Sequence, residues 1–139
     1  MIKELLQPDL PRVVYDIRLD TVGVAKMSRA SRSSGDWGLA LDYGIVGSET
    51  WWLAIEAEKL KLQSFVGIIR LVAGGMGDTL EVHIEGAGGT QRWIAWRGFT
   101  KMLNGKKVCI RYVEMRPKKP IASRPDFLVP VLLQVEVLD

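Results

Sequence analysis

The segment NGKKVCIRYVEM, residues 104–115, decides the fold class that the sequence predicts. Asn104-Gly105 is a strong signal for a hairpin turn, and the residues that follow it alternate with the two-residue period of a β-strand. One side of the extended chain carries Val108, Ile110 and Tyr112, and the other carries Cys109, Arg111 and Val113. The segment therefore reads as a tight turn that opens a half-buried strand.

The same alternation, or a continuous apolar run, recurs along the chain between turn clusters such as GGMGD (74–78) and GAGG (86–89). Strands are expected at residues 13–20, 37–46, 50–57, 65–72, 80–85, 92–97, 106–115 and 127–139. About eight short strands without α–β alternation indicate a mainly β fold. The expected architecture is an antiparallel sandwich of the jelly-roll type or a small barrel.

Two segments leave room for one short helix. Residues 50–57 alternate like a strand, but the stretch to residue 63 is rich in helix formers and Ser48 could cap a helix. The alternation favours a strand over 50–57 and leaves 58–63 open. GFTKMLNG (98–105) has the alternative of one helical turn ended by Gly105.

The length of 139 residues is that of one domain, so residues 1–139 are expected to form a single β domain. The one cysteine, Cys109, cannot form an internal disulfide, and this favours a reducing compartment. The absence of an apolar run of about 20 residues argues against a membrane span. An intracellular protein is expected, cytoplasmic by preference, with a nuclear location as a weaker option from the short PKKP sequence at 117–120.

The basic segment, residues 91–124, dominates the charge distribution. It holds ten Lys and Arg against one anion, Glu114, a local charge of +9, whereas the whole chain carries +3 and the remainder therefore −6. Trp93, Trp96 and Tyr112 are interleaved with these cations. A basic stretch joined to an acidic remainder predicts a surface that faces a polyanion.

Single-stranded nucleic acid is the favoured polyanion, because its bases stack on aromatic rings while cations follow its phosphates. Trp93 is predicted to lie outward beside Arg97 and Arg111, with a place in the core as its alternative. Two basic loops, residues 26–36 and 116–125, could flank the site, and the alternative for each is an ordinary surface loop. The predicted nucleic-acid-binding residues are Trp93, Arg97, Lys106, Lys107, Arg111, Arg116, Lys118, Lys119, Arg124, Arg29 and Arg32.

No constellation for catalysis, a metal or a cofactor is expected. His83 is the single histidine, so a Cys/His zinc site is excluded by count. The carboxylates Glu81 and Glu85 flank His83 on the polar side of a strand, where they are expected to be solvated. Neither glycine cluster has the GK[ST] ending of a phosphate-binding loop.

The sequence thus predicts a non-enzymatic domain that binds RNA or single-stranded DNA through its basic aromatic segment, as part of a homo-oligomer and away from membranes. The alternative is an assembly protein that forms homo-oligomers through apolar strands such as 65–72. A third, distant reading is a small-ligand carrier or an enzyme with a pocket lined by Trp37, Trp51 or Trp52.

Overall fold

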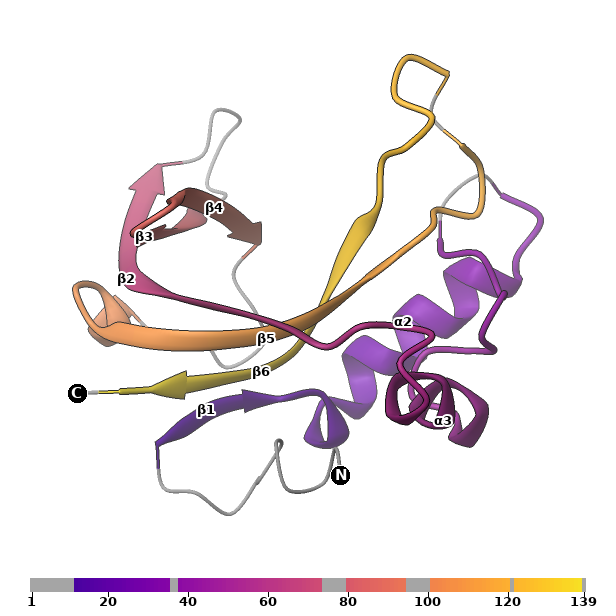
Figure 1. Ribbon diagram of the computed structural model, residues 1–139, viewed down its shortest axis with the longest axis horizontal. Helices are drawn as coiled ribbons and strands as arrows, with labels where there is room; N and C mark the ends of the chain where they lie inside the picture. Colours follow the sequence, from indigo (N-terminus) through magenta and orange to yellow (C-terminus); the bar gives the residue numbers. More distant parts are fainter. Residues whose placement is uncertain (1–11, 36–37, 74–79, 95–100, 121, 139) are drawn as a thin grey trace.

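The computed structural model describes residues 12–35, 38–73, 80–94, 101–120 and 122–138. Its elements are β1 (Val13–Asp16), the 3-10 helix η1 (Ile17–Leu19), α2 (Thr21–Arg32), α3 (Glu49–Glu56), β2 (Gln63–Ala73), β3 (Leu80–Gly86), β4 (Gly89–Ile94), the 3-10 helix η2 (Lys101–Leu103), β5 (Lys107–Met115) and β6 (Val129–Val137). The strands form one antiparallel sheet in the order β1-β6-β5-β2-β3-β4 (Figure 1).

The mainly β class is confirmed, although the architecture differs from the expected one. Over the described ranges there are six strands in one open sheet, rather than about eight strands in a sandwich or barrel. Two segments were expected to supply further strands, 37–46 and 50–57. The described part of the first, 38–46, forms a loop, and the second lies almost entirely in helix α3.

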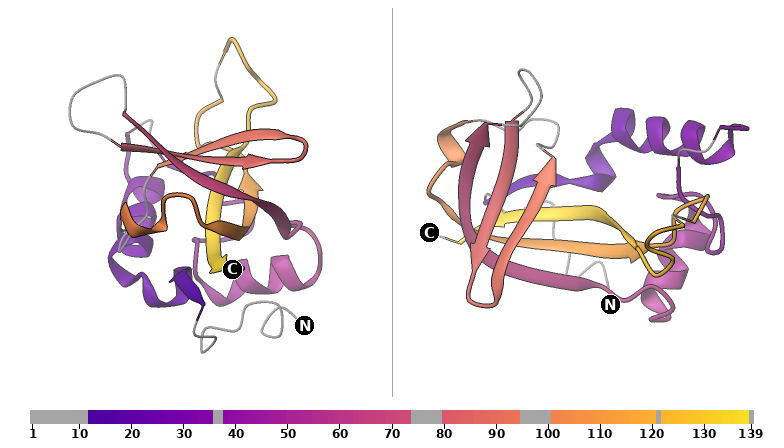
Figure 2. Two further views of the ribbon diagram at one scale, coloured as in Figure 1. Left: turned by 90° about the vertical axis from the view of Figure 1, so that its left-hand side faces the viewer. Right: turned by 90° about the horizontal axis from the view of Figure 1, so that it is seen from above.

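The sheet bends sharply along β2. The first half of β2 pairs with β5 and its second half with β3, so that β3 and β4 pass across β5 and β6 (Figure 2). Gly67 lies at the changeover, where an added Cβ would stand 2.6 Å from the carbonyl oxygen of Glu85. A glycine therefore permits the close approach of the two strands at the bend.

Each face of the central strands carries its own core. The inner core lies between the two halves of the bent sheet and contains Val108, Ile110 and Tyr112 of β5, as their alternation predicts. The outer core lies under the helices and contains Val113 and Met115 of the same strand. Because helices cover the second face at this end, β5 is apolar on both sides there.

The first helix, α2, corrects the prediction of a polar loop at 26–36. Asp20 caps the helix: its Oδ1 accepts a hydrogen bond from the backbone N–H of Gly23 (3.0 Å). Glycine and serine weaken helix propensity in this stretch, and the cap together with contacts to the sheet outweighs them. The Asp20 cap was the signal that could have shown this helix from the sequence.

The second helix, α3, corrects the preference for a strand at 50–57. Ser48 Oγ accepts a hydrogen bond from the backbone N–H of Trp51 (3.2 Å), which is the cap that the alternative required. In the described part of 37–46 the chain makes only isolated bridges, one of them between Leu39 and Pro117. The strand expected at 13–20 ends at Asp16, where η1 begins.

Asn104-Gly105 makes a turn, but not the predicted hairpin. β5 pairs with β2 and β6, whereas β4 pairs with β3. Gly105 adopts a left-handed φ of 86° after η2, so the alternative of one helical turn ended by glycine is confirmed. Asn104 Oδ1 accepts a hydrogen bond from the backbone N–H of Leu71 (3.1 Å) and ties the turn to β2. None of the helices within the described ranges is long and apolar enough to cross a membrane.

Candidate functional site

Helix α2 lies against the outer core with little cover. Of its twelve residues only Ser31 is buried, while Val24 and Met27 are half-buried against the outer core. Tertiary packing of an apolar face is the main source of helix stability in proteins. A helix that is packed this sparsely leaves most of its surface available to a partner.

The carboxyl end of α2 is tied down by polar contacts. Ser31 Oγ accepts a hydrogen bond from the backbone N–H of Leu39 (3.0 Å), and Lys118 Nζ donates to the carbonyl oxygens of Ala30 (2.9 Å) and Ser33 (2.7 Å). The ammonium group of Lys118 thus satisfies carbonyl groups that a helix end leaves unpaired. The loop after α2 also approaches the helix closely at Gly38, which has a φ of 122° and whose added Cβ would stand 2.7 Å from Ser31 Cα.

Replacing Lys118 by methionine is expected to lower the free energy of unfolding by about 1–2 kcal/mol, because two carbonyl groups at the end of α2 lose a charged donor. Methionine retains the aliphatic stem, so the change reports on the ammonium group. Urea unfolding followed by circular dichroism measures the effect. The matched control is Lys101→Met at an exposed position in η2, where no loss is expected. Equal stability of the two variants would contradict the assigned role of Lys118.

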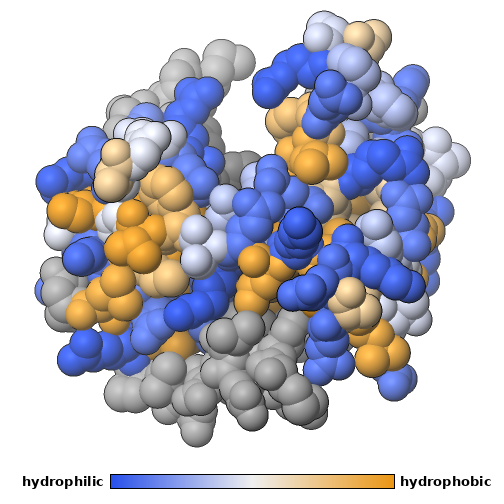
Figure 3. Space-filling view, in the orientation of Figure 1, coloured by the Kyte–Doolittle hydropathy of each residue, from blue (hydrophilic) through white to orange (hydrophobic). Residues whose placement is uncertain are grey.

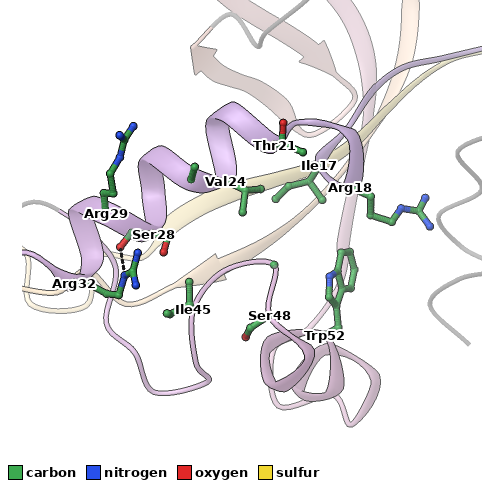
Figure 4. A pocket seen from close by; sticks show the side chains of 12 residues that line it. Ile17, Arg18, Thr21, Val24, Ser28, Arg29, Arg32, Ile45, Ser48 and Trp52 are labelled. Atoms are coloured by element: carbon green, nitrogen blue, oxygen red, sulfur yellow. Dashed lines mark hydrogen bonds between the residues drawn. The ribbon is translucent and has the colours of Figure 1, made fainter.

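A cleft of about 610 Å³, hereafter the α2 cleft, lies between α2 and the segment that leads into α3 (Figure 4). It is lined by Ile17, Arg18, Thr21, Val24, Ala25, Ser28, Arg29, Arg32, Ile45, Gly47, Ser48 and Trp52. Val24, Ile45 and Trp52 point toward the space between the two elements. The cleft thus has an apolar interior with hydroxyl groups and guanidinium groups at its edges.

The charge of the α2 cleft is positive, because its lining includes three arginines and no carboxylate. Arg18 is neutralised by its neighbour Asp16, to which it donates from Nε (2.9 Å) and Nη2 (2.7 Å). Burial alone would raise the pKa of Asp16, but these hydrogen bonds hold that pKa below its usual range. Arg29 and Arg32 form no ion pair with any of the described residues, so the net charge of the cleft comes from them.

A second hollow, of about 580 Å³, lies on the opposite side of α2. Met27, Ala30 and Ser31 border it on the helix, and Phe127 and Val129 are among the residues opposite. The guanidinium carbon of Arg124 stands 4.9 Å from the centre of the Phe127 ring. Helix α2 therefore forms a ridge between two hollows.

Trp93 is half-buried against the inner core rather than fully outward. It pairs with the buried Val82 across β3 and β4 and packs edge-on against Tyr112, with ring centres 5.3 Å apart. Its Nε1 donates to Gln91 Oε1 (3.2 Å), and Gln91 Nε2 donates in turn to the hydroxyl of Tyr112 (3.1 Å). Arg111 lies on the opposite face of β5 from Tyr112, and Trp93 and Arg111 therefore do not share a surface.

Several cations of the basic segment are engaged within the chain. Arg116 forms two hydrogen bonds to Asp42 (2.8 and 3.0 Å), and these hold the pKa of that carboxyl below its usual range. Arg111 Nη1 donates to Gln134 (2.9 Å) and Glu136 (3.1 Å). With Lys118 at the end of α2 and Arg124 over an aromatic ring, much of the charge excess serves contacts inside the molecule.

The other predicted site residues are divided between two ends of the molecule. Lys106 and Lys107 are exposed at the start of β5, far from α2 (Figure 1). Lys119 borders the second hollow, and Arg97 lies outside the described residues. Only Arg29 and Arg32 line the α2 cleft. The sequence did not indicate the cleft, because its members are contributed by segments that are distant along the chain.

The described residues offer neither a metal site nor a reactive thiol. Among them, no group of three His, Cys, Asp or Glu side chains could hold a metal ion. Cys109 is buried, and burial raises the pKa of its thiol, which disfavours the reactive thiolate. On the face of the molecule that Figure 3 shows, hydrophobic residues lie interspersed among hydrophilic ones.

Comparison with protein families identifies the class of this chain. The family model described as "Immunity protein RhsI2" matches residues 12–120, a span that includes α2, α3 and the whole lining of the α2 cleft. Immunity proteins of this family act by binding a toxin protein and not by catalysis. The prediction of a non-enzymatic protein is therefore confirmed.

The predicted partner was wrong. The family binds a protein, so the assignment of RNA or single-stranded DNA as the partner, and with it the nucleic-acid-binding role of the basic segment, is overturned. The family match also argues against the two alternatives, an assembly protein and a ligand carrier or enzyme. The expected homo-oligomer stays a prediction. A comparison with curated proteins finds no match. Because the family model covers well over half of its length, the chain belongs to the RhsI2 immunity protein family.

Proposed function

We propose that this protein protects a cell by binding a cognate Rhs toxin and neutralising it. The observation that carries the proposal is the match of the immunity-protein family over residues 12–120. The structure offers what such a role needs, namely a sparsely covered helix beside an apolar cleft whose Arg29 and Arg32 form no ion pair with any described residue. Interfaces between proteins combine an apolar centre with a polar rim in this way.

To neutralise a toxin by binding alone, the complex must dissociate slowly compared with the time the free toxin needs to act. Protective binding is therefore expected to be tight and stoichiometric, with slow dissociation, since affinity differences between related complexes reside mostly in the dissociation rate. No catalytic group of the immunity protein takes part. Its role is to occlude or hold the toxin.

The test is co-expression of this chain with Rhs toxin domains from the genome that encodes it. We expect one toxin domain to arrest growth when expressed alone, and growth to be restored when the chain is present. The purified pair is expected to elute as one complex in size-exclusion chromatography. An unrelated bacterial toxin serves as the control, and the chain should leave its toxicity unchanged. If no Rhs toxin domain from that genome is neutralised or bound, the proposed function is wrong.

A further inference from the structure

We propose that the α2 cleft is the toxin-docking site and that it receives an acidic segment of the toxin carrying at least one apolar side chain. This inference rests on the proposed function and specifies the partner's chemistry. It follows from the charge of the helix, from the lining of the cleft and from the sparse packing of α2, which are taken in turn.

The charge of α2 calls for an acidic partner. The helix carries Lys26, Arg29 and Arg32 and no carboxylate from Thr21 to Arg32. Arg29 and Arg32 lie in its last turn, where cations also favour the helix dipole. Nothing else in the cleft lining supplies a negative charge to pair with them. Carboxylates of a partner would make charge-assisted, bidentate contacts with these guanidinium groups.

The interior of the cleft is suited to an apolar side chain of the toxin segment, beside the carboxylates that would contact Arg29 and Arg32. Val24 and Ile45 face each other across the space, and Trp52 projects from α3 to complete the lining (Figure 4). Further exposed apolar residues lie on η1, α2 and α3: Leu19 is 74%, Val22 52% and Leu53 54% exposed. Tryptophan and arginine are the residue types that most often dominate binding energy at protein interfaces.

The same features favour the toxin over other occupants. A nucleic acid would need an open aromatic face, whereas Trp52 is half-buried and packs edge-on against Trp51 at 4.8 Å between ring centres. A second copy of this chain, docked by a two-fold axis, would place one basic α2 against the other. Such a like-charge contact opposes self-association at this surface.

Charge reversal at α2 tests the proposal. The double variant Arg29→Glu with Arg32→Glu is expected to weaken binding of the purified toxin domain by about 100-fold in biolayer interferometry. The matched control is Lys101→Glu with Lys106→Glu, which makes the same charge change at exposed positions distant from the cleft. The control is expected to change affinity by less than about threefold, since surface charges away from an interface act weakly through screened solvent.

Filling the cleft gives a second test that does not depend on charge. Ala25 is exposed and lines the α2 cleft, so the substitution Ala25→Trp would fill the cleft. The control is Ala87→Trp, at an exposed position in the turn between β3 and β4. Ala25→Trp is expected to abolish protection in co-expression, while Ala87→Trp retains it. Melting curves of all variants verify that the fold is intact.

Hydrogen exchange of the wild-type complex keeps the proposal testable if a variant fails to fold. Amides of α2 and of residues 45–52 are expected to exchange more slowly when the toxin is bound. The proposal is overturned if wild-type protein binds the toxin while the α2 variants bind equally well or this region shows no protection. If the wild-type protein binds no Rhs toxin at all, the proposed function itself fails, and the docking site fails with it.

Discussion

Replacing Trp51 by alanine is expected to lower the free energy of unfolding by about 3–5 kcal/mol, because a fully buried aromatic side chain is removed from the outer core. Trp51 has 0% exposure and joins α3 to the sheet. Its Nε1 donates a hydrogen bond to the sulfur of Met115 on β5 (3.3 Å). Loss of this side chain would take away a large part of the 5–15 kcal/mol that stabilises a typical domain.

Urea unfolding followed by far-ultraviolet circular dichroism measures this loss without relying on tryptophan fluorescence. The control on the same helix is Leu53→Ala, whose side chain is exposed, and it is expected to change stability by no more than about 0.5 kcal/mol. The packing assigned to α3 would be refuted by a Trp51→Ala protein as stable as the Leu53→Ala protein. Trp52, the neighbour of Trp51 on α3, lines the α2 cleft. A loss of stability in the Trp51 variant is therefore expected to reduce its protection against the toxin as well.

Replacing Asp16 by alanine is expected to lower the free energy of unfolding by about 3 kcal/mol, since a buried carboxylate leaves charged and polar partners unpaired. Asp16 is 5% and Gln134 1% exposed. Asp16 Oδ2 accepts from Gln134 Nε2 (3.2 Å), and Gln134 Oε1 accepts from Arg111 Nη1 (2.9 Å). Arg18 completes the chain of contacts at the mouth of the α2 cleft. The effect is measured by urea unfolding at neutral pH.

The same network makes stability depend on pH in the acid range. The folded protein holds the pKa of Asp16 below its usual range, so the unfolded chain binds a proton more readily than the folded one. The stabilisation from Asp16 is therefore fully present above the unfolded pKa of about 3.9 and is lost as the pH falls through the lower, folded pKa. Asp16→Asn is expected to be less stable at neutral pH and less sensitive to acid than the wild type. A variant with the unchanged acid dependence of the wild type would show that other carboxylates carry it.

The strands were the part of the fold that local patterns could predict. In β2, β3, β5 and β6 the alternation or continuity of apolar residues is strong enough to identify extended chain, and the structure has strands there. Helix α2 escaped prediction because it is polar overall and because Gly23 and two serines lower its helix propensity. Helix α3 was ambiguous, since a short apolar run suits either a strand or a buried helix.

The binding partner was predicted wrongly because a count of charges does not show which of them are engaged in contacts within the chain. Arg111, Arg116 and Lys118 were included in a basic surface, but each is bound to groups from segments that are far away along the chain. Trp93 was placed outward from its position in a strand, but the bend of the sheet brings that face against the inner core, where Trp93 is half-buried. Net charge and residue spacing show neither effect.

The sequence by itself determined the mainly β class and the positions of the central strands, because these depend on local periodicity and on composition. Only the tertiary structure decided which strands pair and which cations are engaged within the chain. It also decided that Arg29, Arg32, Val24, Ile45 and Trp52 line one cleft. These depend on the bend of the sheet and on the packing of α2 and α3. Such long-range contacts leave no periodic trace in the chain, so they become visible only when its distant segments are folded together.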